Sequence, residues 1–171
     1  MRILVAGLGN VLRGDDAFGV RTVAAFRRCA DMDAVTIVDT GIGGIHLVQE
    51  LMQGFDAVLL FDAVDRGQEP GHLSVLEPML PDLQSLTETE RRDYFCETHY
   101  ATPVRALTFA REMGVLPSIV RIIGCQAADA DGFGLGMHPA VEAAIPRAVD
   151  IGRDLVRSLR RELVDQPGPT D

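Results

Sequence analysis

The sequence contains no long hydrophobic run and few cysteines. No apolar stretch approaches the roughly 18 residues of a membrane-spanning helix. Met1-Arg2 leads directly into a short apolar segment, so we expect neither a membrane segment nor a signal peptide. The three cysteines, Cys29, Cys96 and Cys125, are an odd and scattered set. Such a set is typical of reduced thiols, and we therefore expect a cytoplasmic protein.

Positive charge is also scarce. Lys and Arg number 16 against 25 Asp and Glu, which gives a net charge of -9. A general binder of the nucleic-acid backbone needs a basic surface, so we expect no nucleic-acid partner. The length of 171 residues and a hydrophobic content of 47% are ordinary for one globular domain with a real core. We predict a single α/β domain over residues 1–163 and a flexible tail over 164–171.

Apolar segments alternate with helical patterns along the chain. Buried strands are predicted at residues 3–5, 34–39, 56–64 and 118–127, and helices at 17–29, 45–55, 103–113 and in a long final segment. Near-continuous apolar strands between helices indicate a parallel sheet covered on both faces. We therefore predict an α/β fold with three layers, in which a mostly parallel twisted sheet of about five strands lies between helices.

Three less regular features accompany this pattern. Residues 72–78 predict a shorter strand at an edge of the sheet, and residues 78–94 are expected to be irregular. Pro146 is expected to kink the final helix or to mark a restart.

A glycine-rich loop after the first strand carries two carboxylates. Residues 7–20 read GLGNVLRGDDAFGV, and Asp15 and Asp16 fall where a helix begins. A dinucleotide-binding loop would need a third glycine where Leu12 stands, and a phosphate-binding loop would need a lysine and a hydroxyl where the two aspartates stand. The sequence therefore predicts no nucleotide, and the negative charge of the loop indicates a cation.

Carboxylates follow other strands at the same predicted edge of the sheet. Asp39 and Asp62 interrupt the second and third apolar runs, and ligands of parallel sheets bind beyond the carboxyl ends of the strands. Asp16 and Asp62 are the better ligand candidates. Asp15 is expected mainly to cap the helix, and Asp39, which precedes Thr-Gly, is also compatible with a simple turn.

One histidine could complete a metal site with these carboxylates. His99 lies three residues before Thr102-Pro103, a predicted helix start whose dipole favours the neutral imidazole that binds metals. Two carboxylates and one imidazole suit a divalent ion with open coordination positions. Cys125 could act as a nucleophile, but no base is evident near it in the sequence, and a buried thiol is the commoner role.

The loop sequence resembles the opening signature of the hydrogenase maturation endopeptidases, approximately G-x-G-N-x-x-x-x-D-D/E-G/A-x-G. The resemblance continues through VDTGIGGIHLVQEL, LLFDAV, THYATPVRAL and GMHPAVEAAIPRAV, in order and over nearly the whole chain.

The resemblance implies an enzyme that removes the C-terminal extension of a nickel-iron hydrogenase large-subunit precursor after nickel insertion. It implies that Asp16, Asp62 and His99 are the metal-contacting and catalytic residues, and we assign Asp39 and Gly41 to substrate binding. The nickel is expected to arrive with the substrate. The precursor is the expected partner, and the protein itself is expected to be a monomer.

Three other functions remain open at this stage. A non-catalytic metal-sensing chaperone of hydrogenase assembly would carry the same metal-binding residues, and a relative could process a nickel-free precursor. A receiver-like signalling domain is disfavoured, since its acids lie directly after the first strand and a lysine follows the last one, where this chain has Cys125-Gln126. No Ser-His-Asp or HExxH pattern supports a conventional protease mechanism.

Overall fold

The computed structural model describes residues 2–29, 35–96, 102–129, 134 and 136–164. His99 and the predicted tail from residue 165 onward lie outside the described residues.

The described residues form one five-stranded sheet. Its strand order is β2-β1-β3-β5-β4, and every neighbouring pair is parallel except the last. The strands are β1 (Ile3–Leu8), β2 (Val35–Gly41), β3 (Ala57–Val64), β4 (Leu73–Leu76) and β5 (Ile119–Gln126). The predicted mostly parallel sheet is confirmed, and the short segment near residue 73 forms its antiparallel edge strand.

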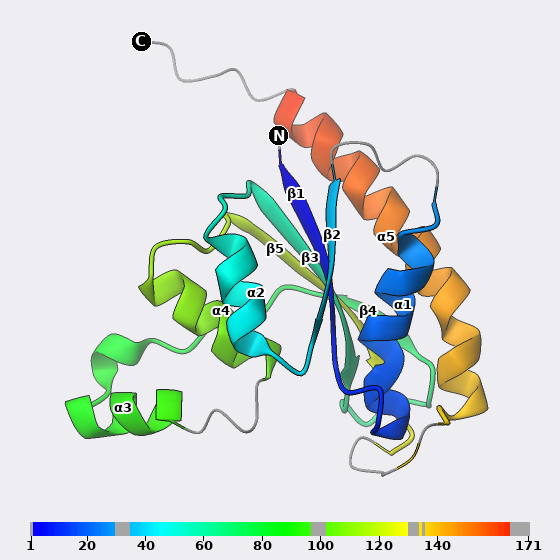
Figure 1. The fold of residues 1–171 in the computed structure, drawn as a ribbon, viewed down its shortest axis with the longest axis horizontal. Coiled ribbons are helices and arrows are strands. Elements are labelled where there is room, and N and C mark those ends of the chain that lie inside the picture. The colour runs from blue at the N-terminus through cyan, green and yellow to red at the C-terminus, as the bar shows by residue number, and fades with distance from the viewer. Residues whose placement is uncertain (1, 30–34, 97–101, 130–133, 135, 165–171) are drawn as a thin grey trace.

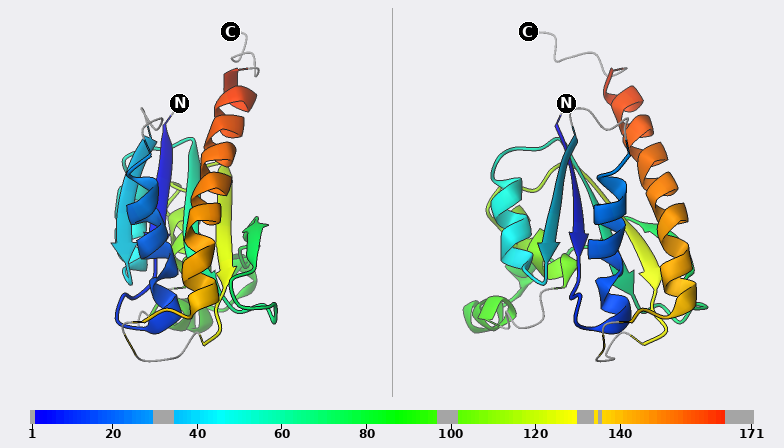
Figure 2. Two further views of the ribbon diagram at one scale, coloured as in Figure 1. Left: turned by 90° about the vertical axis from the view of Figure 1, so that its right-hand side faces the viewer. Right: turned by 45° about the vertical axis from the view of Figure 1, so that its right-hand side comes forward.

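Helices cover both faces of the sheet, which gives the predicted three layers (Figure 1). The helices are α1 (Phe18–Phe26), α2 (Gly44–Leu51), α3 (Glu88–Cys96), α4 (Pro103–Glu112) and α5 (Pro139–Val164). The two views in Figure 2 show α1 and α5 together on one face, while α2 and α4 pair on the other. Within the described residues no helix is long and apolar enough to cross a membrane.

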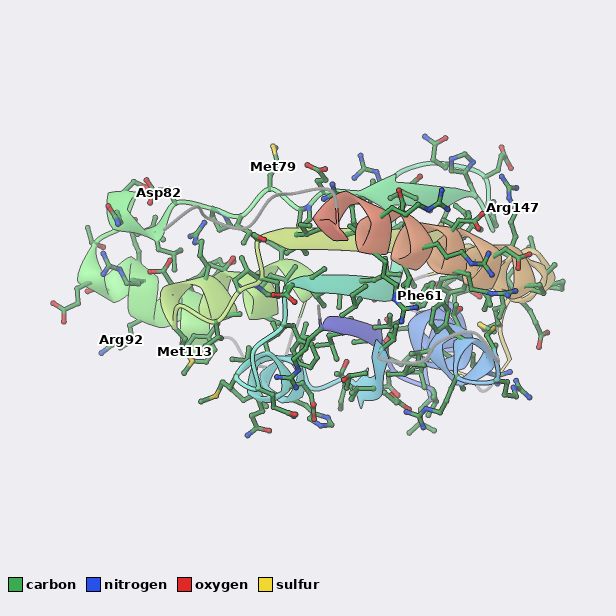
Figure 3. All side chains as sticks on the ribbon, turned by 90° about the horizontal axis from the view of Figure 1, so that it is seen from above. Phe61, Met79, Asp82, Arg92, Met113 and Arg147 are labelled. Carbon is green, nitrogen blue, oxygen red and sulfur yellow. The ribbon has the colours of Figure 1, made fainter. Side chains whose placement is uncertain are left out.

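Each face of the sheet has its own hydrophobic core. Phe18, Phe26 and Val141 pack against one face, and Leu47 and Leu107 against the other; all five are fully or almost fully buried. The alternation of side chains along each strand divides its residues between the two cores. Seen from above, Phe61 of β3 lies near the middle of the molecule, whereas Met79 and Arg92 lie at the periphery (Figure 3).

The prediction of an irregular segment over residues 78–94 holds for residues 78–82 and is wrong for most of the remainder. This segment contains a short turn of 3-10 helix (Leu83–Ser85) and helix α3. Thr87 and Glu90 form a capping box at the start of α3, because the Thr87 amide donates to Glu90 Oε2 (2.8 Å) and the Glu90 amide to Thr87 Oγ1 (3.3 Å). The low hydrophobicity of the segment hid this helix, which lies to the side of the sheet (Figure 1).

Several helix boundaries also differ from the prediction; α2, for example, ends at Leu51 rather than at residue 55. The first helix is preceded by a 3-10 turn (Gly14–Ala17), and α1 ends at Phe26 rather than at residue 29. Of the two alternatives predicted at Pro146, a kink or a restart, the restart does not occur, because α5 continues through Pro146. Its apolar face packs along α1 and the sheet, and this packing holds the helix together where Pro146 has no amide to donate.

Candidate functional site

The candidate site lies where the winding of the sheet changes direction. Strand β1 lies between β2 and β3; the connection from β1 to β2 passes through α1 on one face, and the connection from β2 to β3 passes through α2 on the other. In such sheets a crevice opens at the carboxyl ends of the central strands, and ligands bind there. The carboxyl ends of β1 and β3 point to the lower edge of the molecule in Figures 1 and 2.

Three glycines allow the chain to pack tightly at this edge. Gly9 has φ +123°, and a Cβ atom there would lie 1.7 Å from the backbone oxygen of Asp16. A Cβ on Gly19 would lie 2.2 Å from the backbone oxygens of Leu8 and Phe61, and one on Gly7 would lie 2.3 Å from the oxygen of Gly19. The start of α1 therefore rests directly on the ends of β1 and β3, which explains the glycine spacing of the loop.

The structure brings Asp16 and Asp62 together. Asp62 lies inside β3, two residues before its end, and is only 8% exposed. Burial and, secondly, the negative charge of Asp16 together raise the pKa of Asp62 to about 8, although a backbone hydrogen bond with Ala63 lowers it. Asp62 is consequently protonated near neutral pH. Asp16 is half-buried, and its Oδ2 accepts a hydrogen bond from the Asn10 amide at 2.8 Å.

Asp39 and Gly41 lie at the rim of an adjacent open pocket of about 260 Å³. The carboxylate of Asp39 is exposed, and its Oδ1 accepts the Gly41 amide at 2.9 Å, so the turn expected from the Asp-Thr-Gly sequence is present. Gly41 has φ +55°, a backbone conformation that favours glycine. The remaining lining is mainly apolar and comes from the two glycine loops and the first turn of α1: Gly9, Asn10, Val11, Leu12, Ile42 and Val20.

Asp15 has a structural role, as expected, but not as a simple helix cap. Its side chain is buried and accepts hydrogen bonds from three backbone amides of the connection between β5 and α5. The donors are Ala128 (2.8 Å) and Asp129 (3.2 Å) on Oδ2, and His138 (2.6 Å) on Oδ1. Asp15 therefore joins the first loop of the chain to the last one.

Cys125 is unsuited to act as a nucleophile. Burial, together with the charge of Asp15, raises the pKa of its thiol to about 12, so the thiol stays protonated at neutral pH. The expectation of a buried thiol is confirmed, since Cys125 is 0% exposed.

Two of the three predicted metal-binding residues, Asp16 and Asp62, lie in the part of the chain that the structure describes. Among the residues that the structure describes, no three His, Cys, Asp or Glu side chains gather closely enough to hold a metal ion. The charge of Asp16 acts on Asp62, but His99 lies outside the described residues, so its place in the set stays a prediction.

Sequence reasoning did not single out several residues at this edge. Asn10 orients Asp16, and the exposed apolar side chains of Val11, Leu12 and Ile42 line the pocket beside it. Gln126 is buried, and its Oε1 accepts the amides of Arg66 (2.8 Å) and Gln68 (3.2 Å), which fixes the loop after β3. Apolar residues inside two otherwise glycine-rich loops were the one available signal for the pocket.

The fold and the site together define a doubly wound α/β protein whose switch-point loop presents carboxylates in place of a nucleotide-binding sequence. Residues 20–154 match the hydrogenase maturation protease family. The hydrogenase expression/formation protein HupD of Rhizobium leguminosarum bv. viciae is 35% identical over 158 residues, which span 92% of this chain and 75% of HupD.

Solved structures agree with the sequence match. The hydrogenase maturating endopeptidase HybD from E. coli has a TM-score of 0.71 at 28% identity, covering 95% of this chain and 94% of HybD. The hydrogenase 2 maturation peptidase from a Thaumarchaeota archaeon has a TM-score of 0.64 at 33% identity, covering 91% and 98% of the two chains. The chain belongs to the hydrogenase maturation protease family, whose members are hydrolases that cleave peptide bonds.

Proposed function

We propose that this protein is the endopeptidase that removes the C-terminal extension of a nickel-iron hydrogenase large-subunit precursor after nickel has been inserted. Nickel enters as part of the precursor, and Asp16, Asp62 and His99 are proposed to contact it. Recognition of the metal thereby decides which precursor molecules are cleaved.

The observation that carries the proposal is the buried Asp62 beside Asp16. Burial is the main reason that the pKa of Asp62 is raised, and repulsion from the negative charge of Asp16 adds to it, so ionising both carboxyl groups is unfavourable. A divalent cation between them would replace the proton of Asp62 and relieve the repulsion. The pair is therefore suited to contact a divalent metal that arrives with the precursor.

The pocket beside Asp39 and Gly41 supports a place for the peptide. It opens at the same edge of the sheet as Asp16, because Asn10, whose amide binds Asp16, is part of its lining. Apolar walls with one exposed carboxylate suit an extended segment of polypeptide. We propose that nickel contact places the C-terminal segment of the precursor along this rim.

Cleavage is then a hydrolysis of one amide bond. Water adds to the carbonyl carbon, the C–N bond breaks, and the new amine takes up the proton. The amide is either polarised by a metal ion or attacked by water that a carboxylate activates. The protonated thiol of Cys125 does not supply a nucleophile.

Intact-mass spectrometry of the precursor tests this proposal. We expect a fixed loss of mass from the C-terminus of the nickel-loaded precursor and none from the nickel-free precursor. Binding without loss of mass would instead favour a metal-sensing chaperone of hydrogenase assembly. Cleavage of both forms would contradict the gating by nickel.

Variants of the metal-contacting residues sharpen the same experiment. Asp16→Asn, Asp62→Asn and His99→Ala are each expected to lower kcat/KM by roughly 100-fold or more, since each removes a direct metal contact. Asp56→Asn is the matched control, because Asp56 precedes the amino end of β3 and its Oδ2 accepts the Arg2 amide at 2.7 Å. Wild-type activity in Asp16→Asn or His99→Ala would show that the assignment is wrong.

A further inference from the structure

We propose that Asp15 is a positioning residue for cleavage, which acts by holding the turn that carries Asp16 against the connection between β5 and α5. The inference rests on the proposed function, because it assumes that Asp16 contacts the nickel of the precursor.

The contacts of Asp15 reach both ends of one connection. Oδ2 accepts the amides of Ala128 and Asp129, just after β5, and Oδ1 accepts the amide of His138, just before α5. Three amide donors at 2.6–3.2 Å occupy both oxygens of Asp15, and only a carboxyl side chain offers two acceptor oxygens in this arrangement. One buried side chain therefore fixes the exit of β5 and the start of α5 relative to the first loop.

Backbone contacts join the same two loops a few residues away. The Gly14 amide donates to the Gly134 oxygen at 2.7 Å, and the Gly134 amide donates to the Leu12 oxygen at 3.3 Å. Arg13 and Gly134 form an isolated parallel bridge. The 3-10 turn that contains Asp15 and Asp16 is thus held between β1 and the last connection.

Asp16 depends on this turn for its orientation. Its own amide donates to the Arg13 oxygen at 2.9 Å, and its Oδ2 accepts the Asn10 amide at 2.8 Å. From the described residues its Oδ1 accepts no hydrogen bond, which leaves that oxygen for a ligand. Because Asp15 and Asp16 are consecutive in a short turn, a shift of the Asp15 carboxylate displaces Asp16 relative to Asp62.

Asp15→Asn keeps the size and shape of the side chain but removes one of its two acceptor oxygens. It presents one NH2 group to amides that need an acceptor, so either the contact to His138 or the contacts to Ala128 and Asp129 are lost. We expect Asp15→Asn to lower kcat for the nickel-loaded precursor by roughly 10- to 100-fold, with KM within about twofold of the wild type, because misplacement of a catalytic group acts mainly on the chemical step.

Asp15→Glu is the second variant, because Asp15→Asn could lose part of its fold. Glutamate keeps the charge and both acceptor oxygens but moves them outward by one methylene group. We expect a folded protein with a kcat between those of the wild type and Asp15→Asn. Asp56→Asn again serves as the control. The carboxylate of Asp56 also accepts a backbone amide hydrogen bond, but it lies at the amino ends of the strands, away from the site.

A second measurement does not depend on the precursor. The Asn10 amide reports the position of Asp16, so its NMR resonance is expected to shift in Asp15→Asn and Asp15→Glu but not in Asp56→Asn. If Asp15 only held the connection between β5 and α5, the variants would shift only the NMR resonances of the Ala128, Asp129 and His138 amides. Folded Asp15 variants with an unshifted Asn10 amide and a wild-type kcat would overturn the inference. If the wild-type protein cleaved no precursor, the proposed function would fail, while the Asn10 amide would still decide whether Asp15 orients Asp16.

Discussion

At the scale of single residues, the protonation of Asp62 links the site to the stability of the molecule. The pKa of Asp62 rises from 3.8 to about 8 because the side chain is buried and lies beside Asp16. Between these two pH values the folded protein holds a proton that the unfolded chain releases. The contribution of Asp62 to stability is therefore greatest below the unfolded pKa and is lost as the pH rises toward 8.

Asp62→Asn should remove this part of the pH dependence. For the wild-type protein in the presence of a chelator, we expect the free energy of unfolding to fall by at most about 1.4 kcal/mol per pH unit from this group between pH 5 and 8. Asparagine does not ionise, so the variant should show a flatter profile over the same range. Urea denaturation at several pH values measures this, and parallel profiles for the two proteins would contradict the assignment.

At the scale of elements, glycine allows helix α1 to pack directly against the backbone at the ends of β1 and β3. Gly19 lies in α1, where alanine would normally be the better helix former by about 1 kcal/mol. Its position against the backbone oxygens of Leu8 and Phe61 leaves no room for a methyl group. Packing therefore overrides helix propensity at this point.

We expect Gly19→Ala to destabilise the protein by about 1–3 kcal/mol and to lower the rate of cleavage, because α1 must move away from β1 and β3. Gly136→Ala is the control, since a Cβ atom there meets nothing within 4 Å. It should change stability by less than about 0.5 kcal/mol. Thermal unfolding of the two variants measures the difference. Equal melting temperatures would contradict the close packing of Gly19 against Leu8 and Phe61.

Helix α4 offers a second test at this scale. Thr102 is its N-cap, and Thr102 Oγ1 accepts the Arg105 amide at 3.4 Å, as the Thr-Pro sequence predicted. Thr102→Ala should lower the free energy of unfolding by about 1 kcal/mol. Urea denaturation measures the change, with the conservative Thr102→Ser as the control that keeps the hydroxyl.

At the scale of the whole molecule, one sheet separates two hydrophobic cores. Ile3 belongs to the core under α1 and α5, and Ile122 to the core under α2 and α4. Both cores share the strands, so the domain is expected to unfold as one cooperative unit.

Ile3→Val and Ile122→Val are each expected to cost about 0.5–1.5 kcal/mol. Because the sheet separates the two side chains, the double variant should lose the sum of the two values within about 0.5 kcal/mol. Urea denaturation followed by circular dichroism tests this, and an unchanged dependence on urea would support a single transition. A biphasic curve would show that the two layers unfold separately.

The sequence by itself determined the layers of the fold and the edge where the site lies. Apolar runs of strand length between helical patterns leave little choice but a covered parallel sheet, and the carboxyl ends of such strands share one edge. Asp16, Asp39 and Asp62 were therefore placed at one rim correctly. The helix α3 was missed because its signal is a local capping box rather than hydrophobic periodicity.

Only the tertiary structure decided what these residues do to one another. The raised pKa of Asp62 depends on burial and on the distance to Asp16, neither of which a linear spacing contains. The contacts of Asp15 join residues more than a hundred positions apart, and the pocket arises from two loops that meet only when β1 and β2 pair. Local patterns determine elements because neighbouring residues share a strand or a helix, whereas charge coupling and hydrogen bonding across the sheet edge depend on how those elements pack.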